Sequence, residues 1–411
     1  MSWQPSPGRQ PYRGPTQTQE LFMSIPSARP AHYDELLEKK VRDLLPGFAA
    51  LGLAPSAVHS SPPTGFRLRA EFRVWHEGDA LDYVMFNPKN PKQPIAITHF
   101  DIAAEPIQRL MPILKETLAA TPALRRKLFQ VEFLSTLSGD MLVSLIYHRK
   151  LDEQWHSAAE ALSQQLNVAI VGRSRGQKCV IDRDWVDECL HIKDQPWHYR
   201  QPEQAFTQPN GYINQRMIEW AIGHAAGSSG DLLELYCGIG NFTLPLAAHF
   251  ERVIATELSK VATRAAEHNR TRNNVDNVEF ARMSAEDMSD AMAGTRPFRR
   301  LAHLQQPLQD YRLETLLVDP PRAGLDAMTL QLAQGFQRVI YISCNPTTLQ
   351  ANLKHLSETH RVTDLVFFDQ FPYTHHMECG AMLVRKPKGR DITDNGSSTV
   401  GADNGHSTNI T

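Results

Sequence analysis

The chain has 411 residues, a formal net charge of −2 and a pI near 6.8. Hydrophobic residues make up 41% and charged residues 21%, which is typical of a soluble globular protein with one to three domains. This charge excludes the overall basic character of many nucleic-acid binders, but a local basic patch is compatible with it. The apolar runs are too short to span a membrane and the first residues lack a signal-peptide core, so we expect a cytoplasmic protein without a membrane partner.

The cysteine pattern argues against metal centres and disulfides. The cysteines are Cys179, Cys189, Cys237, Cys344 and Cys379, and none forms a close Cys-x-x-Cys pair. We therefore expect no metal, no iron–sulfur cluster and, in a large chain without an export signal, no disulfide framework.

Composition divides the chain into four parts. Residues 1–30 and 387–411 are polar and aperiodic, and we expect both to be disordered tails. From about Asp231 the pattern of apolar residues changes, and we predict one domain over residues 31–200 and a second over residues 201–386.

In chain order, the first domain should begin with a helix over residues 32–45, where Leu36, Val41 and Leu44 recur at helical spacing. Gly47 follows in a position typical of a helix end. Alternating apolar and polar side chains around turn residues then predict hairpins, and helical spacing predicts two further helices. The hairpins are residues 66–86 and 128–148, and the helices are residues 105–117 and 153–166. Together these helices and hairpins predict an antiparallel α+β domain.

Short apolar strands alternate with helices in the second domain, a pattern typical of a doubly wound parallel sheet. The stretch from Met292 to Tyr311 interrupts this pattern as a polar loop. The expected strands are residues 231–236, 252–256, 277–281, 315–318 and 338–343.

A glycine loop follows the first of these strands. Gly238 and Gly240 allow a ligand to approach the backbone closely. Thr243 stands where a dinucleotide fold prefers glycine or alanine, whereas Glu234 completes an E-x-x-x-G-x-G pattern typical of S-adenosylmethionine binders. Glu257 ends the next strand, where a carboxylate can accept both ribose hydroxyls. The alternative is a plain tight turn.

Two later strands end in reactive side chains. Asp319 precedes two prolines and offers an acceptor in the crevice where strand ends bind ligands; the alternative is a proline turn. Cys344 ends the next strand, and the alternative there is a small buried hydrophobe. A cysteine in such a crevice suits methylation of pyrimidine C5, because a thiolate added to C6 makes C5 nucleophilic. We therefore expect a lowered pKa for Cys344, or a helper beside it.

This chemistry also needs a base that removes the C5 proton. The candidates are His375, His376 and Glu378. The rival use of two adjacent histidines is a metal site, for which further ligands at convincing spacing are lacking.

Basic and aromatic side chains in the first domain are candidates for RNA contacts. Arg67, Arg69 and Arg73 should share one face of a strand and meet phosphates. Phe129 and His148 lie on the second hairpin and would stack on bases. The alternative is a solvated charged face.

The motifs together resemble the RNA uracil-C5 methyltransferases, and most of all the bacterial tRNA (uracil-5-)-methyltransferases. The resemblance runs from about residue 33 to residue 386. Relatives that act on ribosomal RNA usually carry an N-terminal cysteine cluster, and this chain has no cysteine before Cys179. The motifs concerned are residues 206–210, 233–242, 319–325, 343–346 and 368–380.

The resemblance implies a class I S-adenosylmethionine-dependent methyltransferase (Rossmann-like) domain and an N-terminal antiparallel α+β RNA-binding domain. It implies methylation of uridine C5 in the T-loop of tRNA, through a covalent bond between Cys344 and C6, with Glu378 as proton acceptor. The T-like loop of tmRNA is a further candidate substrate, and no obligate protein partner is indicated. Besides Gly238, the implied S-adenosylmethionine contacts are Gln208, Tyr236, Asn241, Glu257 and Asp319, and the implied RNA contacts are Arg73, Phe129 and His148.

Three other readings stay open from the sequence. One is methylation of uracil C5 in ribosomal RNA, and another is methylation of cytosine C5, which uses a similar nucleophile. The third is a non-catalytic protein that helps tRNA to fold.

Overall fold

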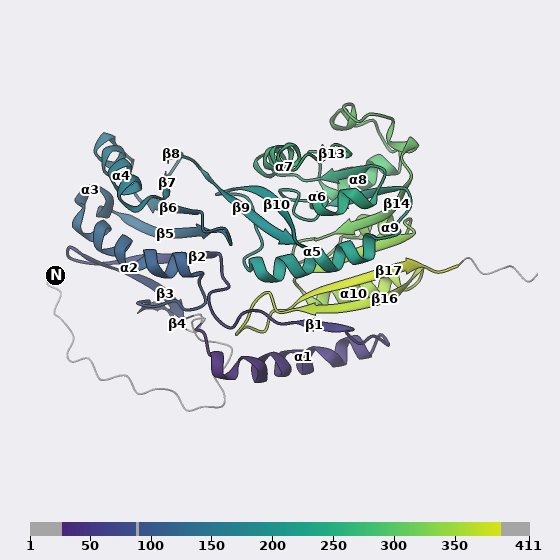
Figure 1. Ribbon diagram of the computed structural model, residues 1–411, viewed down its shortest axis with the longest axis horizontal. Coiled ribbons are helices and arrows are strands. Elements are labelled where there is room, and N and C mark those ends of the chain that lie inside the picture. Colours follow the sequence, from purple (N-terminus) through teal and green to yellow (C-terminus); the bar gives the residue numbers. More distant parts are fainter. Residues whose placement is uncertain (1–26, 88–89, 388–411) are drawn as a thin grey trace, which may run out of the picture.

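The computed structural model describes residues 27–87 and 90–387. The predicted tails, residues 1–30 and 387–411, lie almost wholly outside the described residues. Figure 1 shows a seven-stranded sheet on the N-terminal side of the molecule and an eight-stranded sheet on the C-terminal side. Over the described part of the chain, no helix is long and apolar enough to cross a membrane.

The eight-stranded sheet is the centre of the C-terminal domain. In spatial order its strands are β1 (Ala57–His59), β16 (His360–Phe368), β17 (Glu378–Arg385), β15 (Arg338–Ser343), β14 (Leu313–Val318), β11 (Asp231–Leu235), β12 (Val253–Thr256) and β13 (Val278–Ala281). One face packs on α5 (Gly211–Ala225), α6 (Thr243–Leu246) and α7 (Lys260–Arg272). The other face packs on α1 (Tyr33–Ala49), α8 (Ala285–Met292), α9 (Ala327–Ala333) and α10 (Pro346–Leu356).

Both faces of this sheet are buried, as its apolar strands predict. Successive side chains point to opposite faces, so Leu232 packs with the α5 side and Leu233 with the α1 side. The interrupting stretch between α8 and β14 holds only two short 3-10 helices, η3 (Arg299–Leu301) and η4 (Leu308–Asp310). The prediction of an irregular segment there is confirmed.

The strand β17 runs against the rest of this sheet. It pairs antiparallel with both β15 and β16, whereas β11 to β15 pair in parallel. The five predicted strands are confirmed, but the sheet is mixed rather than wholly parallel. An apolar run carries no signal of strand direction, which explains the difference. As a consequence, β17 begins at the same sheet edge at which β14 and β15 end.

The N-terminal helix and first strand belong to the C-terminal domain. β1 pairs in parallel with β16 at the edge of the eight-stranded sheet, and Figure 1 shows α1 alongside it. The Phe48 ring lies 5.3 Å from that of Phe367. The prediction assigned residues 33–59 to the N-terminal RNA-binding domain. In the structure α1 and β1 pack on the C-terminal sheet instead.

From the sequence we expected Gly47 to end the first helix, and this prediction is wrong. α1 continues through Pro46 and Gly47 to Ala49. A Cβ atom on Gly47 would lie 2.4 Å from the Gln350 side chain of α10. The glycine thus lets two helices approach closely.

The seven-stranded sheet forms the N-terminal domain. In spatial order its strands are β4 (Asn90–Ala96), β3 (Ala80–Asn87), β2 (Arg69–Glu77), β5 (Leu128–Ser135), β6 (Met141–Tyr147), β7 (Ala169–Ser174) and β8 (Gln177–Ile181). They share a core with α2 (Glu105–Ala120), α3 (Pro122–Arg125) and α4 (Glu153–Leu166). Both predicted hairpins and both predicted helices are confirmed. The sheet is not wholly antiparallel, because α4 crosses over between β6 and β7, which pair in parallel.

A two-stranded hairpin, β9 (Trp185–Ile192) and β10 (Gln195–Pro202), lies between the sheets (Figure 1). Its side chains Leu190, Ile192 and Tyr199 share a core with α5 and α7. The predicted boundary at residue 200 therefore also differs from the packing. The segment after β10 leads directly to the motif at residues 206–210.

Candidate active site

Three neighbouring strands bring the predicted reactive side chains to one edge of the eight-stranded sheet. Asp319 follows β14 and Cys344 follows β15, and these strands pair in parallel through Val318 and Tyr341. Ser343 of β15 pairs antiparallel with Cys379 of β17. One further step of this register sets Cys344 opposite Glu378.

Local sequence explains why Cys344 stands at a junction. The apolar residues of β15 end at Ser343, and Pro346 begins α10, where proline is favoured because its missing N–H is not needed. Asn345 caps this helix with its side-chain oxygen, which accepts a hydrogen bond from the Thr347 N–H at 3.2 Å. Cys344 is therefore held between a strand end and a helix start, and its side chain is partly exposed.

Burial raises the pKa values of Cys344, Asp319 and Glu378, and neighbouring carboxylates add to the shift for Cys344 and Glu378. Burial raises the pKa of Cys344 to about 11, with Glu378 and Asp319 adding to the shift. Burial raises the pKa of Asp319 to about 7. Glu378 is 2% exposed, and burial and then Asp319 raise its pKa well above its usual range. The expectation of a lowered pKa for Cys344 is thus wrong for the ligand-free protein.

The expected helper beside Cys344 is Arg322. Its charge and its hydrogen bond act on Cys344 in the direction that lowers the thiol pKa, against the larger effect of burial. Arg322 was not identified as a site residue from the sequence. Its position in the Asp-Pro-Pro-Arg turn was the available signal.

Of the two histidines in the β16–β17 loop, His376 contacts Arg322 and has a lowered pKa. The Arg322 guanidinium donates to the His376 ring, with its nitrogen 3.1 Å from Nε2 and 3.3 Å from Nδ1. Burial, His375 and Arg322 lower the pKa of His376 to about 4. Glu378, by contrast, keeps a buried Oε1 without a hydrogen-bond partner. Within the described residues, no group of three or more His, Cys, Asp or Glu could hold a metal ion.

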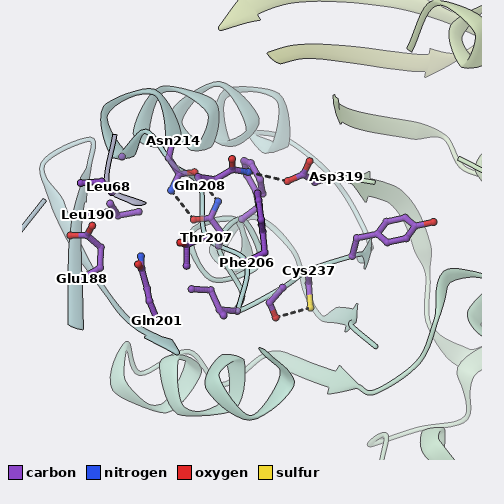
Figure 2. A pocket seen from close by; sticks show the side chains of 16 residues that line it. Leu68, Glu188, Leu190, Gln201, Phe206, Thr207, Gln208, Asn214, Cys237 and Asp319 are labelled. Carbon is purple, nitrogen blue, oxygen red and sulfur yellow. Dashed lines mark hydrogen bonds between the residues drawn. The ribbon is translucent and has the colours of Figure 1, made fainter. Parts of the chain in front are cut away.

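A pocket beside this edge collects most of the predicted cofactor residues (Figure 2). Gln208 Nε2 donates to Asp319 Oδ2 at 3.2 Å, and Gln370 Nε2 donates to Gln208 Oε1 at 2.6 Å. The side chains of Asn214 and Asn241 form two hydrogen bonds of 2.8 Å to each other. The predicted residues that line this pocket are Gln208, Tyr236, Gly238, Asn241 and Asp319.

The glycine loop forms one wall of this pocket. Tyr236 has a φ of 62°, an uncommon backbone conformation that often occurs at functional sites. A Cβ atom on Gly238 would meet no atom within 4 Å, so this glycine faces open space. Glu257 does not line the pocket itself. Its Oε2 accepts a hydrogen bond from the Gly238 N–H at 3.1 Å, which places it at the back of the loop.

A second cleft reaches Cys344 from the side of α1. Its wall includes Lys40, Arg322, Asn345, His375 and His376. Lys40 was not identified as a site residue from the sequence. Lys40 lies between Leu36 and Leu44 at four-residue spacing and therefore on the apolar face of the helix. A charged residue at such a position could have indicated a buried role.

The predicted RNA contacts form one stack on the seven-stranded sheet. The Arg73 guanidinium carbon lies 3.8 Å from the Phe129 ring centroid. The Phe129 and His148 rings stack with centroids 4.0 Å apart. Arg73 and His148 are exposed and Phe129 is half-buried. Arg69 lies on the same face of β2 as Arg73, but its guanidinium donates to the carbonyl oxygens of Glu203 and Ala205 rather than joining this stack.

The family model described as tRNA (Uracil-5-)-methyltransferase matches residues 32–386. The tRNA/tmRNA (uracil-C(5))-methyltransferase of Aromatoleum aromaticum is 52% identical over 364 residues, which cover 89% of this chain and 98% of that protein. The protein of the same name from Vibrio parahaemolyticus is 50% identical over 369 residues, which cover 89% and 100%.

The solved structure of the Pyrococcus abyssi tRNA (uracil-54, C5)-methyltransferase in complex with S-adenosyl-L-homocysteine shares this fold. The TM-score is 0.65 at 21% identity, over 86% of this chain and 83% of that one. The resemblance found from the motifs is thereby confirmed, and this chain belongs to the tRNA (uracil-5-)-methyltransferase family.

Proposed function

We propose that this protein methylates C5 of the T-loop uridine of tRNA and forms 5-methyluridine, with S-adenosylmethionine as methyl donor. The observation that carries the proposal is the juxtaposition of Cys344, Glu378 and Asp319 at one sheet edge beside a pocket. The names of the relatives support tRNA, and also tmRNA, as substrates. Because the substrate is tRNA, we place the reaction in the cytoplasm.

The pocket residues fit S-adenosylmethionine. The open side of Gly238 leaves room for a ligand against the backbone, and Tyr236, Asn241 and Gln208 surround it. Burial raises the pKa values of Asp319 and Glu378, and a cationic sulfonium beside them would favour their ionised forms. Glu257 follows β12, the strand next to β11. Its carboxylate would accept the ribose hydroxyls once its hydrogen bond from the Gly238 N–H is broken.

Cys344 is proposed to act as the nucleophile. S-adenosylmethionine, when bound, supplies an electrophilic methyl group. The Cys344 thiolate adds to C6 of a uracil that has left the stack of the loop, and the electrons of the C5–C6 double bond move onto the C4 oxygen. C5 thereby becomes nucleophilic. Arg322 favours the thiolate form in this step.

Glu378 is proposed to act as the base. After methylation, its carboxylate removes the C5 proton. The C–H electron pair forms the C5–C6 double bond as the C6–S bond breaks and its electron pair returns to sulfur. Burial favours the protonated form of Glu378 in the free protein, and a positive ligand at this edge would favour its ionised form.

The N-terminal domain is proposed to hold the RNA. The stack of Arg73, Phe129 and His148 offers a guanidinium for phosphate and aromatic faces for unpaired bases. Because these residues come from three adjacent segments of one sheet, they form a continuous surface.

Incubation with unmodified tRNA and S-adenosylmethionine labelled in its methyl group, followed by nucleoside analysis, tests this function. We expect the label in 5-methyluridine at the T-loop position, loss of labelling in Cys344→Ala, and normal labelling in the matched control Cys179→Ser. Label in 5-methylcytidine would identify the cytosine alternative. In a parallel incubation with unmodified ribosomal RNA, label there and none in tRNA would identify the ribosomal alternative. Absence of label despite tRNA binding would favour the non-catalytic reading.

A further inference from the structure

A buried lysine of α1 holds the loop that carries Glu378. This loop, residues 369–377, connects the end of β16 at Phe368 to the start of β17 at Glu378. Lys40 Nζ lies 2.5 Å from Asp369 Oδ1 and donates to the carbonyl oxygens of Phe371 and His376 at 3.0 Å each. The three acceptors use all three donors of the ammonium group. Lys40 therefore ties both ends of the loop to one point.

The same network continues to the pocket. Tyr33, also of α1, donates to Asp369 Oδ2 at 2.8 Å and accepts the Ser61 N–H at 2.7 Å. Asn210, which follows the Gln208 segment, donates to the Ser61 hydroxyl at 2.8 Å. All five side chains are buried. The helix thus contacts the base-carrying loop and, through Ser61, the segment that faces the cofactor pocket.

A buried ion pair contributes little net free energy to the packing of a helix. Removing an ammonium and a carboxylate from water costs several kcal/mol for each ion, and apolar side chains of similar size often hold a helix as well. α1 already has such apolar contacts, for example between Phe48 and Phe367. The distinct contribution of Lys40, which is 4% exposed, is the defined position of the two loop carbonyls.

We propose that Lys40 is a positioning residue that aims Glu378 at the C5 proton. The inference rests on the proposed function and deepens it. His376, held through its carbonyl oxygen, is two residues before Glu378 along the chain. Loss of the tether lets Glu378 drift and slows proton removal, whereas addition of Cys344 to C6 does not require Glu378. A displacement of about 1 Å at a reacting group can lower a rate by about 100-fold.

Two T-arm RNAs separate these steps, one with uridine at the target and one with 5-fluorouridine. The fluorinated base accepts the Cys344 thiolate and the methyl group but has no C5 proton, so the adduct persists. Its rate of formation reports addition and methyl transfer, and turnover on uridine RNA also requires proton removal. The ratio of the two rates therefore reports on the removal of the C5 proton by Glu378.

In Lys40→Met we expect turnover on uridine RNA to fall by about 10- to 100-fold. Adduct formation on 5-fluorouridine RNA should change little, and a methylated adduct should accumulate on uridine RNA. The double variant Lys40→Met/Asp369→Asn removes both charges, leaves no unpaired buried ion, and should show the same ratio if the single variant folds poorly. Phe48→Leu is the matched control, because it loosens α1 without touching the loop and should leave the ratio unchanged.

If the ratio of the two rates is unchanged in the Lys40 variants, whether or not both rates fall, the role of Lys40 is merely structural and the inference is overturned. Failure of the wild-type protein to form an adduct with 5-fluorouridine RNA would instead overturn the proposed function itself.

Discussion

Cys344 and Glu378 face each other across two antiparallel strands, one register step beyond the pair of Ser343 and Cys379. This relationship joins the proposed nucleophile and the proposed base, which lie 34 residues apart in the sequence. It arises because β17 runs against β15, so that the start of one strand meets the end of the other. A wholly parallel sheet would separate the two groups by the length of a strand.

Replacement of Glu378 by glutamine should stop the reaction after methyl transfer. The amide keeps the size of the side chain but cannot remove the C5 proton, so a covalent protein–RNA complex should accumulate on natural uridine RNA. Denaturing gel electrophoresis with labelled methyl groups measures this complex. Glu358→Gln, at an exposed carboxylate after α10, is the control and should turn over normally. Free methylated RNA at the wild-type rate would exclude Glu378 as the base.

Alkylation of Cys344 in the ligand-free protein should accelerate with pH up to the alkaline limit of folding. Its pKa of about 11 leaves little thiolate at neutral pH. Asp319→Asn removes one of the charges that raise this pKa, so the variant should react faster at the same pH. Mass spectrometry of the Cys344 peptide after iodoacetamide treatment measures the rate. A plateau below pH 8 in the wild-type protein would contradict this electrostatic account.

Stability should fall with rising pH because of Glu234. Its side chain is buried, Oε2 has no hydrogen-bond partner, and burial raises its pKa from 4.5 to about 8. A raised folded-state pKa means that the folded protein binds the proton more tightly, so stability is lost between about pH 4.5 and pH 8.

Glu234→Gln should remove this part of the pH dependence. Near pH 8.5 the variant should be more stable than the wild type relative to pH 5, by on the order of 2–4 kcal/mol. Urea unfolding at the two pH values measures the difference. Glu267→Gln, at an exposed side chain of α7, should follow the wild type, and an equal slope for Glu234→Gln would refute the assignment.

Removal of the Phe129 ring should weaken RNA binding more than catalysis. Stacking of a base on an aromatic ring contributes about 1–3 kcal/mol, so Phe129→Ala should raise KM for tRNA by about 5- to 100-fold with a smaller change in kcat. Arg73→Ala should act in the same direction and reduce the salt dependence of binding. Arg109→Ala, on the exposed surface of α2, is the control. An unchanged KM in both variants would place the RNA elsewhere.

Two of the proposed reactive groups could be placed from the sequence because each one follows an apolar strand. Asp319 and Cys344 end such runs, and parallel strands bring their ends together. The direction of β17 was not predictable, since the residues of an apolar run read the same in either direction. The three-residue β1 is too short for a periodic signal, and residues 33–59 were therefore assigned to the wrong domain.

Single residues could be misread for physical reasons. Gly47 resembles a helix stop, but its missing side chain serves the contact with Gln350. Lys40 reads as an ordinary helix charge until its place on the apolar face is noticed, and its partner Asp369 lies 329 residues further along the chain. Such pairs become visible only when the fold brings distant segments together.

Peptide mapping of the complex between the wild-type protein and 5-fluorouridine T-arm RNA tests the central claim most directly. The account predicts that, in the presence of S-adenosylmethionine, the peptide containing Cys344 carries one methylated 5-fluorouridine nucleotide. A nucleotide on Cys379 or another cysteine, or no covalent complex at all, would contradict it.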